Sequence, residues 1–417
     1  MLQDVKPERD IYKLKRDIKM LDIILAVLIG IVFGILSGLI PGIHINLVAT
    51  LLFTYSTFFL SLTSPLALAV FIISMTIAHT FLDFLPSIFL GAPEEDTALS
   101  ILPGHRMLLE GHGYEAIKLT SIGCFSGIII AIILSLIFIP TAPLFYPYLS
   151  KIMAFLLISL SLFLVWKEKK ELKIFAILVF ILSGILGYAA LNLTVIKQPL
   201  FPLFTGLFGT SLLTLSFFQD VKIPKQSLKK TKTNKKDLFK SLGLSILSSS
   251  LVSFLPGVGA SQAVIASSIK KIEEKSFLIL LGAVNTITVL LSFVALYAIK
   301  KPRSGVAVFV GKFLPDISFS HLMLLMLIAL IVGAIIFPLT LLLARRFSRL
   351  IEKVNYRWLC FSIIIFLIIL TPIISGWLAF IVLITGTCLG IFCSLIGIKK
   401  IFLMGALILP VIIWYLL

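Results

Sequence analysis

Residues 23–82 form a run of sixty residues that contains no lysine, arginine, aspartate or glutamate. A helix of about 20 apolar residues is already long enough to cross a bilayer. The whole chain has 417 residues, of which 59% are hydrophobic and 13% are charged. The long Leu, Ile and Phe runs do not alternate as the strands of a membrane barrel do. We therefore expect an all-α polytopic membrane protein in the cell membrane.

The apolar segments predict about ten to twelve transmembrane helices, and those too short to cross are expected to be re-entrant. A basic stretch at 219–240 interrupts the middle of the chain. It separates a first membrane repeat, 20–218, from a second, 241–417, and a polar segment, 1–19, precedes both. Because the first residues are polar and mixed in charge, no cleaved signal peptide is expected ahead of the first span.

The net charge of +17 arises from basic residues that cluster between apolar runs. Six lie in 6–19, four in 167–173, eight in 222–240 and five in 345–357. Such clusters mark cytoplasmic loops by the positive-inside rule. We therefore expect 1–19 and 219–240 to face the cytoplasm, and we expect the basic surface to meet membrane lipid rather than nucleic acid.

Residue patterns typical of enzymes and metal sites are missing from the sequence. The four cysteines lie in apolar runs without metal-ligand spacing, which predicts small core residues. The sequence contains no HExxH, no phosphate-binding loop and no serine in a nucleophile turn. We expect no catalysis, no metal and no cofactor other than Na⁺ as a possible coupling ion. A membrane hydrolase is the remaining enzymatic alternative.

The two halves of the chain contain similar Pro-Gly segments. The first half has SGLIPGIHINLVAT at 37–50, and the second has SFLPGVGASQAVI at 253–265. In each segment an apolar stretch leads to Pro-Gly and then to polar residues. This similarity predicts an internal two-fold repeat. Gly/Pro-interrupted segments at corresponding places in two halves indicate a transporter binding site.

Residues 241–269 are uncharged, with Pro256 and Gly257 at their centre and lysines beyond both ends. Each arm is roughly 14 residues, or about 21 Å of helix, which is shorter than the roughly 30 Å hydrocarbon core. We therefore expect a re-entrant hairpin whose tip lines a cavity. The alternative is a proline kink packed on small residues.

A helix that restarts at such a tip presents unpaired N–H groups with a partial positive charge. Ser261 is placed to cap the helix or to contact a ligand, and Gly257 and Gly259 allow a close backbone approach. Two such tips would bind an anion at mid-membrane. The expected substrate-binding residues are Pro41, Gly42, His44, Asn46, Pro256, Gly257, Gly259, Ser261, Gln262 and Asn285.

Ionisable residues inside apolar runs indicate functional sites. His79 and Asp83 are four residues apart and share one helix face. Asp83 is expected to carry a coupling proton or sodium ion, and a structural His–Asp pair is the alternative. The polar group around 94–97 suits a cation site or a solvated first helical turn. The expected coupling-ion residues are Asp83, Glu94, Asp96, Thr97 and Thr286.

Four segments resemble the TctA family, the large membrane subunit of tripartite tricarboxylate transporters. They are LIPGIHIN (39–46), LGAPEEDTALSILPGHRMLLEGHG (90–113), FLPGVGAS (254–261) and LGAVNTITV (281–289). The chain looks closest to the shorter, stand-alone prokaryotic relatives, with supporting segments across roughly 20–310. Two positions depart from the family pattern. His44 stands where the family has a glycine, and no glutamate precedes Asn285.

The resemblance implies a symporter of small organic anions, di- or tricarboxylates, driven by Na⁺ or H⁺. It also implies a small membrane subunit and an extracytoplasmic binding protein as separate chains, and a homodimer is a further possibility. The alternative is a transporter of a polyprenyl phosphate or a similar lipid phosphate, which would also use helix N-termini to bind phosphate. A closed aqueous pocket between the tips would favour the first function, and a lateral apolar cavity would favour the second.

Overall fold

The computed structural model describes the chain except residues 1–5, 41–44, 91–100, 219–222, 229–233, 254–272, 303 and 354. The described residues form helices and connecting loops, with no strand among them. In chain order the elements are α1 (Lys6–Leu39), α2 (Ile45–Thr54), α3 (Ser56–Leu62), α4 (Pro65–Leu82), η1 (Pro86–Leu90), η2 (Ile101–His105), α5 (Arg106–Leu109), α6 (Gly113–Lys151), α7 (Met153–Trp166), η3 (Lys170–Leu172), α8 (Lys173–Asn192), α9 (Leu200–Phe204), η4 (Thr205–Thr210), α10 (Ser211–Phe218), α11 (Lys235–Val252), α13 (Glu274–Ile299), α14 (Gly305–Phe313), α15 (Phe319–Ile351), α16 (Tyr356–Ser375), α17 (Ala379–Ile396), η5 (Lys400–Met404) and α18 (Gly405–Leu416).

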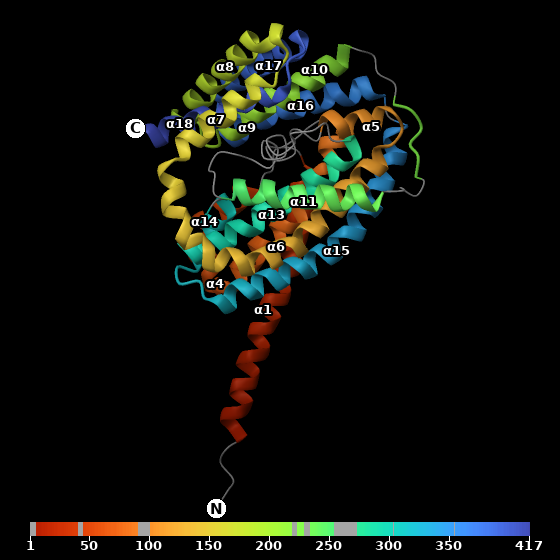
Figure 1. Ribbon diagram of the computed structural model, residues 1–417. Helices are drawn as coiled ribbons and strands as arrows, with labels where there is room; N and C mark the ends of the chain where they lie inside the picture. The colour runs from red at the N-terminus through yellow and green to blue at the C-terminus, as the bar shows by residue number, and fades with distance from the viewer. Residues whose placement is uncertain are drawn as a thin grey trace, which may run out of the picture.

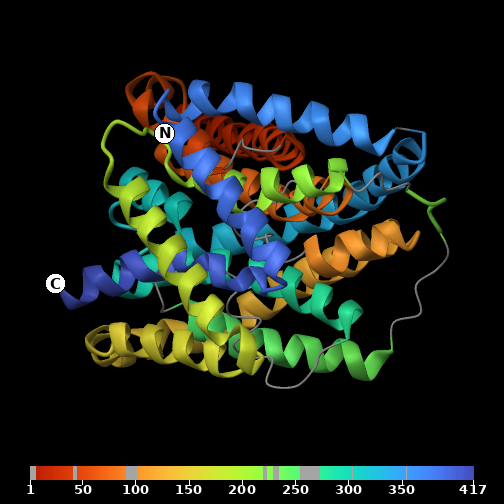
Figure 2. The ribbon, with the colours of Figure 1, turned by 90° about the horizontal axis from the view of Figure 1, so that it is seen from above.

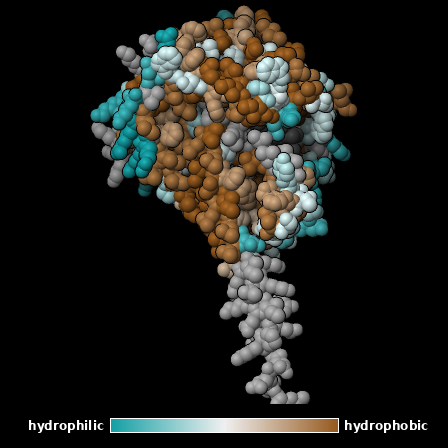
Figure 3. All heavy atoms as spheres, turned by 180° about the vertical axis from the view of Figure 1, so that it is seen from behind, coloured by the Kyte–Doolittle hydropathy of each residue, from teal (hydrophilic) through white to brown (hydrophobic). Residues whose placement is uncertain are grey.

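Nine helices within the described ranges are long and apolar enough to cross a membrane. They are Met20–Leu39, Pro65–Leu90, Gly113–Leu149, Lys170–Asn192, Leu200–Phe218, Glu274–Ile299, Phe319–Ile351, Arg357–Ser375 and Ala379–Ile396. Two shorter apolar helices, Met153–Trp166 and Lys400–Leu416, accompany them. Large hydrophobic side chains cover much of the outer surface (Figure 3). A lipid-facing surface requires such side chains, so the prediction of an all-α multi-pass membrane protein is confirmed.

The helices gather into two bundles, which Figure 1 shows one above the other. The first bundle contains α1, α2, α4, α6, α11, α13, α14 and α15. The second contains α7 to α10 and α16 to α18, and its last helix runs outward to the C-terminus at the edge of the molecule (Figures 1 and 2). Each half of the chain therefore contributes helices to both bundles.

Glycines set the closest helix contact of the N-terminal region, between α1 and α4. Gly30, Gly34 and Gly38 are spaced by four residues and lie on one face of α1. A side chain at any of them would clash with α4, at Phe71, Met75 and Leu82 in turn. Since both residue numbers rise together, α1 and α4 run parallel. Small residues let membrane helices approach in this way.

A second glycine contact joins α6 to α13. A side chain at Gly123 would clash with the Ile279 carbonyl, and one at Gly127 with the Ala283 backbone. These pairings make α6 and α13 parallel. The neighbouring helix α4 runs the opposite way to α6, because the Cys124 thiol donates to the Thr80 carbonyl while Phe89 packs on Gly113. It follows that α4 and α13 are antiparallel.

The basic linker is fixed to one end of the first bundle by Gln226. The Gly113 N–H donates to Gln226 Oε1 over 2.9 Å, and the Gln226 N–H donates to Glu352 over 2.7 Å. Gly113 begins α6, whose direction is opposite to that of α4 and α1. The start of the first span, at Met20, therefore lies at the other end of the bundle from Gln226.

Candidate functional site

Buried polar side chains meet where α4 packs among α1, α6 and α13, and we call this cluster the polar centre. Each of its side chains is 3% exposed or less. Its members are Ser37 from α1, His79, Thr80 and Asp83 from α4, Cys124 from α6 and Thr286 from α13. Polar groups inside a span are costly to bury, so a cluster of six identifies this region as the candidate functional site.

The α4 side of the polar centre carries its two titratable residues. His79 Nδ1 and Ser37 Oγ are 3.0 Å apart and form a hydrogen bond. The histidine tautomer determines which of the two atoms is the donor. The Asp83 N–H donates to the His79 carbonyl over 2.9 Å, as the last hydrogen bond of the helix. Asp83 follows α4 directly and precedes the π-helical turn η1. Its carboxyl therefore sits where regular helix gives way to irregular backbone.

Helices α6 and α13 contribute Cys124 and Thr286 to the other side of the polar centre. The Cys124 thiol donates to the Thr80 carbonyl over 3.4 Å. It also lies within hydrogen-bonding reach of the Thr286 side chain and within electrostatic range of Asp83. The close glycine contact between α6 and α13 brings these two helices near enough for both side chains to face α4. Cys124 thus connects α6 with both α4 and α13.

Asn285 precedes Thr286 on α13 and is 1% exposed. Neither atom of its amide group has a hydrogen-bond partner among the residues described. A buried amide without a partner costs about 1–3 kcal/mol. A ligand or ion that supplied the missing contacts would recover this free energy.

Among the described residues, the polar centre offers one carboxyl group together with imidazole, hydroxyl, thiol and backbone carbonyl groups. Oxygen ligands of this kind suit a hard cation such as Na⁺ or a proton. In the part of the chain that the structure covers, no three His, Cys, Asp or Glu side chains come together to hold a metal ion.

The residues predicted from sequence divide into two sets. Asp83 and Thr286 lie together in the polar centre, and Asn285 is next to it in the chain. Asn46 lies on α2, within the helix that follows the first Pro-Gly pair. The other predicted residues lie outside the described residues: Pro41, Gly42, His44, Glu94, Asp96, Thr97, Pro256, Gly257, Gly259, Ser261 and Gln262.

Sequence reasoning missed Cys124 and Ser37 as members of the polar centre. Cys124 looks like an ordinary small core residue, and Ser37 has no neighbour in sequence that identifies its role. The glycines at Gly34 and Gly38 around Ser37 carry the only local signal, because they predict a close contact for that face of α1.

At the linker end of the first bundle, charged residues anchor the helix ends to one another. Arg106 and Glu274 form a 2.6 Å ion pair, and Lys275 pairs with Glu115 over 2.6 Å. His105 is buried, and its Nδ1 lies 2.9 Å from the Ile88 carbonyl. Burial lowers the pKa of His105 from its ordinary value of 6.5, and the hydrogen bond to Ile88 acts in the opposite direction.

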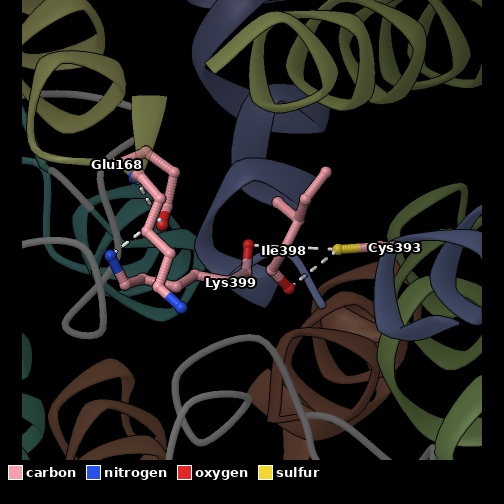
Figure 4. A network of polar contacts seen from close by, with 5 residues as sticks. Glu168, Cys393, Ile398 and Lys399 are labelled. Carbon is pink, nitrogen blue, oxygen red and sulfur yellow. Dashed lines mark hydrogen bonds and ion pairs between the residues drawn. The ribbon is translucent and has the colours of Figure 1, made fainter. Parts of the chain in front are cut away.

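The connection between α17 and α18 in the second bundle holds another polar network (Figure 4). Lys399 Nζ pairs with Glu168 over 2.9 Å, and the Cys393 thiol donates to the Ile398 carbonyl over 3.5 Å. The next residue, Lys400, is 7% exposed. Its amine has no hydrogen-bond partner among the described residues. Sequence reasoning passed over Lys400 because a lysine pair after an apolar run is typical of a membrane flank.

Many membrane spans around a buried ionisable centre define the class of multi-pass membrane transport proteins. The model of the tripartite tricarboxylate transporter TctA family matches residues 24–405. The chain belongs to the TctA family, as the resemblance predicted. It is 30% identical to the uncharacterized protein MJ1079 of Methanocaldococcus jannaschii over 357 residues, which covers 83% of this chain and 88% of that protein. No solved structure matches the chain.

Proposed function

We propose that this chain is a secondary active transporter of small di- or tricarboxylates, driven by a Na⁺ or H⁺ gradient, in which Asp83 binds the coupling ion. Membership in a transporter family places the chain in the transport class. The observation that carries the proposal is the burial of Asp83 at the end of α4, within electrostatic range of Cys124 on α6. A carboxylate held at that depth is costly unless hydrogen bonds or an accompanying cation compensate its charge, and a bound coupling cation or proton would add to that compensation.

The substrate anion is proposed to bind at the Pro-Gly segments. The first segment follows α1, and α1 ends beside Asp83: the Asp83 backbone nitrogen lies 3.3 Å from the position that a side chain at Gly38 would take. An anion bound next to α1 and a cation bound at Asp83 would stabilise one another. Such mutual stabilisation makes loading of one dependent on the other, which is the requirement for symport.

The proposal includes an inverted relation between the two halves. In the first half α1 packs on α4, and in the second α11 packs on α13. Across the halves α4 packs on α15 and α13 packs on α6, and α4 and α13 run in opposite directions. Inverted repeats of this kind are common in secondary transporters. The proposal therefore places Met20 and Gln226 on opposite sides of the membrane, whereas the sequence predicts that 1–19 and 219–240 both face the cytoplasm.

The family works with further subunits, and we propose a small membrane subunit and an extracytoplasmic binding protein as separate partners.

The structure contains an apolar cavity, and such a cavity would favour the alternative function, transport of a lipid phosphate. The charged residue that lines this cavity is an aspartate, Asp22. An aspartate repels a headgroup that carries only negative charge, such as a polyprenyl phosphate, which disfavours the alternative.

The test of the coupling role is uptake of labelled citrate and smaller dicarboxylates into proteoliposomes under an imposed Na⁺ or H⁺ gradient. Asp83→Asn keeps the size of the side chain and removes its charge. We expect gradient-driven uptake to fall by about a hundredfold, the equivalent of about 2.7 kcal/mol. Asp316→Asn is the matched control, because Asp316 lies exposed in the loop before α15 and should transport like the unaltered protein.

Full gradient-driven uptake by Asp83→Asn would contradict the coupling role.

The anion site is tested separately with Gly257→Leu, which places a large side chain at the second Pro-Gly segment. Gly243→Leu is its control, because no atom of the described residues lies within 4 Å of the position that a side chain at Gly243 would take. Loss of uptake in both glycine variants would argue against a binding role for Gly257.

A further inference from the structure

A cavity of about 650 Å³ lies between α1, α2, α3 and the first turns of α4, and the described residues that line it all belong to the first bundle or to α3 beside it. Hydrocarbon side chains form nearly all of its wall. Leu25, Ile29 and Phe33 line it from α1, and each is between 42% and 50% exposed. The floor includes Phe71, which meets Phe33 edge to face with ring centroids 5.6 Å apart. The cavity is therefore a groove that opens toward the lipid.

Polar groups occur at one end of this groove. Asp22, Tyr55 and Thr63 line it. Asp22 lies near the start of the first span at Met20, and Tyr55 and Thr63 are the residues immediately before and after α3. Because α1 and α4 run parallel from this end, the groove passes from a polar mouth to an apolar depth at Phe33. A tyrosine and an acidic side chain at the start of a span are typical of the membrane–water interface.

The size of the groove decides what can occupy it. An α-helix with its side chains is about 10–12 Å across, so a 10-residue helix, about 15 Å long, fills roughly 1,200 Å³ or more. This is about twice the volume of the groove, so the groove cannot enclose a helix of a partner or of a second copy, which could only pack across its open side. An extended hydrocarbon chain is much thinner, and it matches the apolar wall.

We propose that this groove binds one acyl chain of a membrane lipid whose amine headgroup lies beside Asp22. The carboxylate attracts an ammonium group and repels a headgroup that carries only negative charge. The chain would pack along Leu52 of α2, the helix that restarts after the first Pro-Gly pair. A lipid seated there would contact α2 from outside. The proposal does not depend on the transported substrate.

The test uses phosphatidylethanolamine with a photoreactive diazirine on its acyl chain, in vesicles of phosphatidylglycerol that contain the purified full-length protein. After irradiation, mass spectrometry locates the adducts. We expect them to concentrate on α1, α2 and the start of α4. Phosphatidylglycerol with the same diazirine is expected to label these helices about tenfold less, a difference of about 1.4 kcal/mol.

Val48→Trp and Ile29→Trp each fill the groove from a different wall, and both residues line it. Either variant should lower the labelling by about tenfold. Leu327→Trp is the control, since Leu327 is 54% exposed on α15 and lies outside the groove. Asp22→Asn should remove the preference for the amine lipid while the chain still binds.

Labelling that spreads evenly over exposed positions such as Leu327, or that persists in both groove variants while they remain monodisperse, would overturn the acyl-chain site. Equal labelling by the two lipids would overturn the headgroup assignment to Asp22.

Discussion

Asp83 and His79 illustrate what one helix can bring together without help. Their four-residue spacing puts both on one face of α4, and both are buried. The hydrogen bond from this pair to Ser37 and the neighbourhood of Cys124 come from other helices. The residues that make the site more than a His–Asp pair are therefore supplied by tertiary contacts.

His105 gives a prediction at the same scale, for stability against pH. Its pKa is lower in the folded protein than the ordinary 6.5 because burial disfavours the charged ring. Below pH 6.5 the unfolded chain binds this proton more readily than the folded chain does. The free energy of unfolding therefore decreases as the pH is lowered. Each unit of the shift corresponds to about 1.4 kcal/mol.

Thermal unfolding in detergent between pH 7.5 and pH 5 measures this effect. We expect His105→Gln, which can still donate to the Ile88 carbonyl, to unfold with a weaker dependence on pH than the unaltered protein. His112→Gln is the control, because the His112 side chain is 48% exposed. Identical pH profiles for the unaltered protein and His105→Gln would refute the role of His105.

At the scale of elements, contacts between glycine faces and backbone set the helix pairs. A side chain at Gly123 would clash with a backbone carbonyl of α13, which cannot rotate away as a side chain can. These contacts hold Cys124 and Thr286 in place, because both residues are next to the glycines or opposite them. Packing of α6 on α13 and the geometry of the polar centre are therefore linked.

Gly123→Ala should destabilise the protein by about 1–3 kcal/mol, the usual cost of overpacking a close contact. Gly243→Ala adds the same methyl group to a helix with open space around it. It should leave stability unchanged or raise it by up to about 1 kcal/mol. Unfolding midpoints in detergent measure both changes. Equal shifts in the two variants would mean that the glycine contact does not determine the stability of the α6–α13 pair.

At the scale of the whole molecule, each half of the chain supplies helices to both bundles. The directions of the helices show which residues lie at each end of the first bundle. Met20 lies at one end and Gln226 at the other. Lys301 follows α13, which runs away from the Gln226 end because it is parallel to α6. Lys225 is next to Gln226 in the linker. These positions allow the orientation of the chain to be measured.

In a Cys388→Ala background, Lys225→Cys and Lys301→Cys should react with a membrane-impermeant maleimide from opposite sides of the membrane. An epitope at the N-terminus should be accessible from the same side as Cys introduced at 301. The three remaining cysteines are buried and should stay unlabelled. An N-terminus on the side of the linker would argue against the inverted relation of the two halves.

The sequence by itself determined the class of fold, the break between the end of α1 at Leu39 and the start of α2 at Ile45, and the position of His79 and Asp83 on one helix face inside an apolar segment. Each of these depends on local properties: the apolar content of a segment, the loss of a backbone donor at proline, and the spacing of residues on one helix. The helix pairs, the two bundles, the lipid-facing groove and the meeting of Ser37, Cys124 and Thr286 at Asp83 were decided only by the tertiary structure. In lipid every apolar face is acceptable to the solvent, so hydrophobic pattern alone does not select helix partners. The selection rests on close contacts between small residues far apart in the chain, and these exist only once the helices have packed.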